Sequence, residues 1–158
     1  MKTLVIFYSR TGRTRKVAEQ LSALLGADKE ELLESESRKG VKGFLMGGRD
    51  AWKGNLSKLG SQQNDPATYD LTVLAGPVWA FTMCPAIRTY LQANCEKIKR
   101  AAFICTQGGS GAVRAFAEME KALGKAPANT LTLIDKDIDR DLIAPQVNAF
   151  AQSLKEEG

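Results

Sequence analysis

Near its start the chain reads Leu4-Val5-Ile6-Phe7-Tyr8-Ser9-Arg10-Thr11-Gly12-Arg13-Thr14. The first five of these residues are apolar, which is typical of a strand buried on both faces. The residues that follow carry apolar side chains at helical spacing, at Val17, Leu21, Leu24 and Leu25. The sequence therefore predicts a buried strand, a short loop over residues 9–14, and a helix that begins at the end of this loop.

Loop 9–14 combines features that favour a bound anion. The first turn of a helix leaves its backbone N–H groups without helical acceptors and forms the positive end of the helix dipole. Ser9, Thr11 and Thr14 add hydroxyl groups, and no carboxylate lies in the loop. Gly12 lets the backbone approach a ligand closely. A serine or threonine here could serve only as a helix cap, but a cap alone does not call for two further hydroxyls, a glycine and two arginines. We expect a phosphate site.

The rest of the chain alternates between strand and helix patterns. Apolar runs predict strands at residues 71–75, where Gly76-Pro77 would end the strand, at 101–105 and at 130–134. Helical spacing predicts helices near residues 85–93, 113–123 and 143–154 and a glycine-broken helix near 42–53, whereas residues 29–33 suit a strand or a helix. Strands separated by helices imply a parallel sheet covered on both faces. We therefore expect an α/β fold in a single domain, residues 1–158.

The composition restricts where the protein resides. Of its 158 residues, 44% are apolar and 25% charged, as is ordinary for a soluble globular protein. The apolar run near the N-terminus is too short for a signal peptide, and no run approaches the roughly 20 apolar residues of a membrane helix. We expect a cytoplasmic protein without membrane insertion.

Metal-binding and nucleophilic side chains are few. The chain has no histidine, and its three cysteines, Cys84, Cys95 and Cys105, are widely spaced without a Cys-x-x-Cys pair. This pattern argues against a disulfide framework, a zinc or haem site, and a Ser-His or Cys-His nucleophile. We therefore expect no metal and no catalytic side chain, so redox chemistry here would require an organic cofactor.

Opposite charges gather in two parts of the chain. Residues 38–58 contain six lysines or arginines against one acid, and from Asp135 onward six acidic residues outnumber three basic ones. Such an asymmetry could orient a charged partner. Charge runs usually form an ordinary solvated surface, and that explanation stays open.

Two further loops follow predicted strands. Residues 76–82 place two large aromatic side chains after the strand at 71–75, where they could stack on a planar ring. Residues 106–111 offer flexible backbone N–H and C=O groups to the edge of such a ring. Because ligands of parallel sheets bind at the carboxyl ends of strands, these loops and loop 9–14 should converge on one edge. A phosphorylated, flat heterocycle such as FMN suits the three loops together.

In these motifs the chain resembles the flavodoxin family. The resemblance rests on Ser9-x-Thr11-Gly12-x-Thr14 after the first strand, on Gly76-Pro77-Val78-Trp79 after the third, and on Thr106-Gln107-Gly108-Gly109-Ser110-Gly111 after the fourth. It spans almost the whole chain. It implies a three-layer flavodoxin-like sandwich, in which a five-stranded parallel sheet of order 2-1-3-4-5 has helices on both faces, and a non-covalently bound FMN.

The resemblance also implies roles for residues of the three loops. The phosphate would be held by Ser9, Thr11, Gly12 and Thr14, with backbone N–H groups from Arg10 and Arg13. The isoalloxazine would be lined by Pro77, Val78, Trp79, Ala80 and Phe81, with Trp79 stacked on it. Backbone at residues 79–81 or at Gly108 and Gly109 would contact its N5 and O4. Thr106 and Gln107 would lie by the pyrimidine edge or the ribityl chain, and Ser110 completes the expected cofactor-binding set.

Two departures from the family bear on function. The net charge is +4, whereas many electron-carrying flavodoxins are strongly acidic around the flavin. Residues 108–111 contain no aromatic side chain, where many of these proteins place a tyrosine, so one flavin face would be open to a hydride donor or a quinone.

We expect electron transfer through bound FMN, with a redox partner protein or NAD(P)H as partner. An NAD(P)H-dependent FMN oxidoreductase of quinones or nitro compounds is the alternative, and an interaction module that has lost the cofactor is a third.

Other phosphate-binding folds fit loop 9–14 less well. A phosphorelay receiver domain needs acidic residues after its first strand, and a Rossmann dinucleotide site needs Gly-x-Gly-x-x-Gly there. A small tyrosine phosphatase needs a cysteine nucleophile, and a P-loop NTPase needs Gly-Lys-Ser or Gly-Lys-Thr. The loop contains none of these. We expect a monomer or homodimer that binds no nucleic acid.

Overall fold

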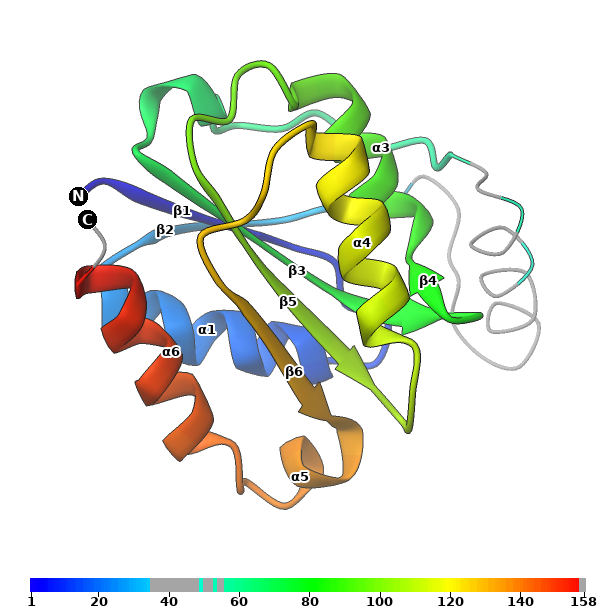
Figure 1. Ribbon diagram of the computed structural model, residues 1–158, viewed down its shortest axis with the longest axis vertical. Coiled ribbons are helices and arrows are strands. Elements are labelled where there is room, and N and C mark those ends of the chain that lie inside the picture. Colours follow the sequence, from blue (N-terminus) through cyan, green and yellow to red (C-terminus); the bar gives the residue numbers. More distant parts are fainter. Residues whose placement is uncertain (35–48, 50–52, 54–55, 157–158) are drawn as a thin grey trace.

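A central sheet separates two helical layers in the computed structural model, which describes residues 1–34, 49, 53 and 56–156 (Figure 1). The parallel strands are β1 (Thr3–Phe7), β2 (Asp28–Glu31), β3 (Leu71–Trp79), β5 (Ala101–Gln107) and β6 (Thr130–Ile134). The helices are α1 (Arg13–Leu25), the 3-10 turn η1 (Pro66–Thr68), α3 (Pro85–Asn94), α4 (Ala112–Leu123), α5 (Asp135–Asp139) and α6 (Ala144–Glu156). The α/β class predicted from the sequence is confirmed.

The five parallel strands follow the predicted order, and the sheet has one further strand that the sequence did not predict. The order is β2-β1-β3-β5-β6, which corresponds to 2-1-3-4-5 when only parallel strands are counted. A sixth, short strand, β4 (Thr82–Met83), pairs with the end of β3 in the antiparallel direction. Residues 29–33, which suited a strand or a helix, contribute to β2, which lies parallel to β1.

Strand β3 runs beyond the point at which the sequence predicted its end. Gly76 and Pro77 continue the ladder, and Pro77 is still paired with Thr106 of β5. Gly76 therefore does not end the strand, and the absence of a side chain at this position lets helix α3 pack closely against β3. A Cβ at this position would lie 2.8 Å from Cγ1 of Ile87 on α3. The segment expected to be a loop over residues 76–82 is therefore mostly a β-hairpin.

Alternate side chains of the strands enter two separate apolar cores, as the two-residue period of a strand requires. In β1, Leu4 and Ile6 pack on the side of α3 and α4, whereas Val5 and Phe7 pack on the side of α1 and α6. Figure 1 shows these two helix pairs on opposite faces of the sheet. Packing of these two cores against the sheet holds its strands in place, and the carboxyl ends of the parallel strands lie along one edge.

Parts of the predicted layout are not covered by the described residues. The helix predicted near residues 42–53 lies outside them except for residues 49 and 53, and of the basic run at 38–58 the structure describes residues 49, 53 and 56–58. Helix α5, which the sequence did not predict, begins directly where β6 ends. Among the helices that the structure describes, none has the length and hydropathy needed to cross a membrane.

Candidate functional site

The three loops meet in one cavity of about 250 Å³ at the carboxyl edge of the sheet. Its walls come from the loop after β1, the ends of β3 and β5, and the first residue after β6. The residues that line it are Arg10, Thr11, Arg13, Thr14, Pro77, Val78, Trp79, Thr106, Gln107, Gly108 and Asp135. The other expected site residues do not line it; these are Ser9, Gly12, Ala80, Phe81, Gly109 and Ser110.

The amino end of α1 opens on this cavity. Gly12 precedes the helix with a φ of 94°, a conformation that a glycine adopts readily. Its N–H donates to the Ser9 hydroxyl at 3.1 Å, so Ser9 closes the loop on itself. The first helical hydrogen bond runs from Lys16 N to Gly12 O at 3.0 Å. The N–H groups of residues 13–15 therefore have no acceptor within the helix and are available to an anion.

A buried pair of hydroxyls joins this helix to the end of β5. Thr14 Oγ1 and Thr106 Oγ1 lie 2.9 Å apart, and both side chains are 2% exposed. Two hydroxyls that share one hydrogen bond keep one further hydrogen to donate. The pair therefore fixes α1 relative to β5 and leaves a donor at the cavity wall.

The wall formed by β3 carries Trp79, which is only 6% exposed. Its ring packs edge-to-face on Tyr8, with centroids 5.5 Å apart and an interplanar angle of 88°. The guanidinium carbon of Arg10 lies 5.9 Å from the Trp79 ring centroid. A planar ligand that stacks on this ring would have to displace that guanidinium, so the stacking of Trp79 on a ligand stays a prediction.

The hairpin that joins β3 to β4 is strained and firmly held. Its two central residues, Ala80 and Phe81, have φ of 48° and 64°, as in a type I′ turn. Phe81 is 59% exposed at the tip. The Thr82 hydroxyl donates to Glu118 of α4, and Arg88 of α3 donates to the same carboxylate oxygen at 3.0 Å. Partial burial acts to raise the pKa of Glu118, but its hydrogen bonds from Thr82 and two arginines hold it below its ordinary value.

The loop after β5 is organised by Gln107. Its Oε1 accepts a hydrogen bond from Ala112 N at 2.9 Å, and its Nε2 donates to Gly109 O at 3.2 Å. The side chain thus caps the start of α4 instead of standing free at the cavity. Gly111 packs under the β3–β4 hairpin, because a Cβ there would lie 2.8 Å from Phe81 Cα.

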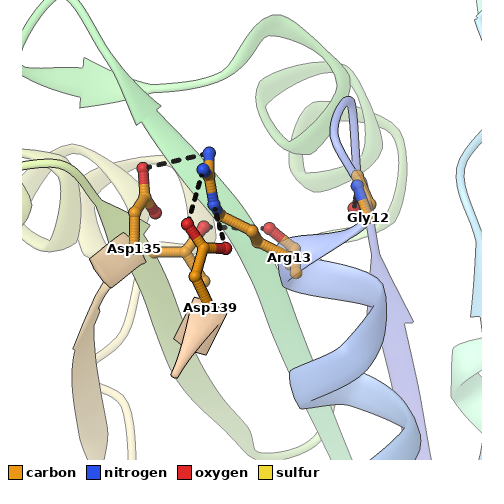
Figure 2. A network of polar contacts seen from close by, with 7 residues as sticks. Gly12, Arg13, Asp135 and Asp139 are labelled. Atoms are coloured by element: carbon orange, nitrogen blue, oxygen red, sulfur yellow. Dashed lines mark hydrogen bonds and ion pairs between the residues drawn. The ribbon is translucent and has the colours of Figure 1, made fainter. Parts of the chain in front are cut away.

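The side chain of Arg13 points to α5 (Figure 2). Its Nε and Nη2 donate to the two carboxylate oxygens of Asp139, each at 2.8 Å, and its Nη1 lies 3.7 Å from Asp135 Oδ2. Hydrogen bonding to Asp139 raises the pKa of Arg13, and the same bond lowers the pKa of Asp139. The charge of Arg13 is therefore largely balanced by carboxylates of α5.

The fold resembles solved structures of flavin proteins. The flavoprotein of Lactobacillus acidophilus NCFM in complex with FMN is 23% identical, covers 88% of this chain and 97% of its own, and has a TM-score of 0.73. The Streptococcus pneumonia TIGR4 flavodoxin is 13% identical over all of both chains, with a TM-score of 0.60. Oxidised Flavodoxin 1 of Bacillus cereus is 15% identical, covers 99% of this chain and 98% of its own, and has a TM-score of 0.59. The chain has the flavodoxin-like fold. No protein-family model and no curated protein sequence matches it.

One cavity residue of this flavodoxin-like chain, Asp135, was not singled out from the sequence. It follows the strand at 130–134 directly, and the rule that selected the other three loops applies to this strand end as well. Burial raises the pKa of Asp135 above its ordinary value, while Arg13 and Arg10 act to lower it. The cavity therefore contains a carboxylate although loop 9–14 contains none.

Proposed function

We propose that this chain binds FMN non-covalently in the cavity and transfers electrons through it. The observation that supports this best is the convergence of the amino end of α1 with the β3 and β5 strand ends in one cavity of about 250 Å³. The Lactobacillus acidophilus flavoprotein, which shares the fold, is known as an FMN complex. When bound, FMN supplies one- and two-electron redox chemistry, and the protein supplies binding, orientation and electrostatics.

The groups at one end of the cavity fit a phosphate ester. The N–H groups of residues 13–15, the Thr11 side chain and the Thr14–Thr106 hydroxyl pair offer neutral donors. The α1 dipole adds a positive potential. Because Asp139 engages the Arg13 guanidinium, we expect residue 13 to contribute its backbone N–H and not its side chain.

The other walls fit a planar ring. Pro77, Val78 and Trp79 present apolar and aromatic surface, and Gly108 presents backbone without a side chain. The hydrogen bonds of Glu118 to Thr82 and Arg88 hold the hairpin beyond Trp79 in place. This rigidity would let the cavity accept the ring with little rearrangement of the backbone.

The test replaces Thr11, an exposed residue of the cavity wall, by glutamate. A carboxylate about 5 Å from the phosphate costs about 3 kcal/mol at the effective dielectric of a protein surface, so we expect FMN affinity to fall about 100-fold. Quenching of flavin fluorescence measures the Kd, and Thr11→Gln is the neutral control of similar size. Equal FMN affinity of the two variants would refute the proposal that the phosphate lies at this loop.

A second function, an NAD(P)H-dependent FMN oxidoreductase of quinones or nitro compounds, is favoured by one feature. A Cβ at Gly109 would meet no atom within 4 Å, and Gly108–Gly111 contains no aromatic side chain. A ring in the cavity would therefore have no aromatic cover from this loop, which leaves room for a hydride donor. Anaerobic mixing of the FMN-loaded protein with NADH or NADPH separates the two functions. Prompt bleaching of the visible spectrum would favour the reductase, and no bleaching would favour a carrier that depends on a partner protein.

A further inference from the structure

The Arg10 guanidinium lies against the aromatic wall of the cavity. Arg10 and Trp79 both line the cavity, and the guanidinium carbon is 5.9 Å from the centroid of the Trp79 ring. A guanidinium over an indole is attracted to the negative face of the ring. Trp79 is only 6% exposed, so a planar ligand can stack on it only where a neighbouring side chain gives way. Arg10 is the side chain that covers the ring from the cavity.

Of these two side chains, Trp79 is the one held in place. Tyr8 packs edge-to-face on its ring, with an interplanar angle of 88°, and the Tyr8 hydroxyl donates to Glu34 Oε2 at 2.9 Å. Arg10 is half-buried and belongs to the loop after β1. Its long side chain can exchange between several rotamers. A planar ligand that enters the cavity would therefore move Arg10 and leave Trp79 where it is.

The moved guanidinium stays near the groups that we assign to the phosphate. Arg10 directly precedes Thr11 in the loop that leads to the amino end of α1, and both residues line the cavity. Arg13 is the other cation of the lining. It donates two hydrogen bonds to Asp139 and lies 3.7 Å from Asp135, the carboxylate of the lining. Of the two arginines, Arg10 is therefore the one whose side chain can turn from the ring to the phosphate end.

We infer that the Arg10 side chain makes the cavity select phosphorylated flavins. The inference rests on the proposed function, because FMN is the ligand concerned. Any flavin that stacks on Trp79 breaks the contact between the guanidinium and the indole, which lowers its affinity. FMN offsets this loss, since the guanidinium then forms a charge-assisted contact with the phosphate. Riboflavin, which has no phosphate, displaces Arg10 without such a contact. No covalent bond changes.

The experiment measures the Kd of FMN and of riboflavin on the full chain freed of flavin, by quenching of flavin fluorescence. The proteins are the wild type, Arg10→Gln and, as a control, Arg140→Gln. Glutamine at position 10 keeps the backbone N–H of the loop and removes only the guanidinium. Arg140 is exposed and does not line the cavity, so its variant has the same net charge as Arg10→Gln without the change at the site.

We expect Arg10→Gln to bind FMN about tenfold more weakly than the wild type, because the charged contact with the phosphate is lost. The same variant should bind riboflavin about threefold more tightly, because no cation has to leave the indole. The preference for FMN over riboflavin then falls about 30-fold. Arg140→Gln should keep the wild-type preference. Added salt should weaken FMN binding more in the wild type than in Arg10→Gln.

An Arg10→Gln variant with the wild-type preference would overturn the inference. This holds if both affinities stay the same, if both fall together as in a damaged cavity, or if both rise together because Arg10 only obstructs the ring. An equal loss of preference in Arg140→Gln would also overturn it, since the effect would then come from net charge. In each of these cases FMN still binds and the proposed function stands. If the wild type bound neither flavin, the proposed function would fall and the inference with it.

Discussion

Replacing Gly111 by alanine should destabilise the protein far more than the same change at Gly12. The two glycines have nearly the same backbone conformation, with φ and ψ of 110° and −11° at Gly111 and of 94° and −10° at Gly12. Both also precede a helix at the N-cap position. They differ in their surroundings, because a Cβ at Gly12 would meet nothing within 4 Å.

At Gly111 the new methyl group would collide with two neighbours. It would lie 2.8 Å from Phe81 Cα and 2.8 Å from Val78 Cγ1. The hairpin cannot easily withdraw, since Glu118 holds it through Thr82. Overpacking of this kind costs about 1–3 kcal/mol, and an alanine with positive φ costs about 1–2 kcal/mol. We expect a loss of about 2–5 kcal/mol for Gly111→Ala against about 1–2 kcal/mol for Gly12→Ala.

Urea unfolding monitored by tryptophan fluorescence measures both losses. The slope of the free energy of unfolding against urea should be the same for the two variants, so that the midpoints report stability alone. The difference between the variants isolates the collision from the backbone strain that they share. Equal midpoints for Gly111→Ala and Gly12→Ala would refute the packing of Gly111 against the hairpin.

The remaining predictions concern the hairpin and the loop after β5. Glu118→Gln should lower the free energy of unfolding at neutral pH by about 1–2 kcal/mol, because it removes charge-assisted hydrogen bonds. Since the folded-state pKa of Glu118 lies below its ordinary 4.5, this contribution is present above that pH and is lost as the pH falls through the folded-state value. The gap between wild type and variant should therefore close in urea titrations at acidic pH, and a gap independent of pH would contradict the assignment. Gly109→Tyr, at a position with open space, should shift the midpoint potential of bound FMN by adding an aromatic ring beside it. Identical potentials in redox titrations of the two FMN-loaded proteins would count against an open flavin face.

Local patterns were sufficient for most of the fold. The apolar run at residues 4–8 and the helical spacing after Thr14 predict β1 and α1, because a buried strand and an amphipathic helix each impose a period on the sequence. The convergence of the three loops also followed from the sequence, because parallel strands place their carboxyl ends on one edge. The predicted end of β3 was wrong because Gly76 was interpreted as a strand terminator. This glycine instead leaves room for Ile87 of α3, and the local sequence does not show that α3 packs there.

By itself, the sequence determined the α/β class and the loops that form the cavity, since these depend on apolar period and on chain direction. The order of the parallel strands was implied by the resemblance to the flavodoxin family. The tertiary structure alone decided which polar groups act on one another. Arg13 binds Asp139 across 126 positions, Thr14 meets Thr106 across 92, and Asp135 reaches the cavity from the last strand. Such pairings depend on how the strand ends are placed in space. A hydrogen bond between two residues that are distant in the sequence produces no repeating pattern in the residues between them.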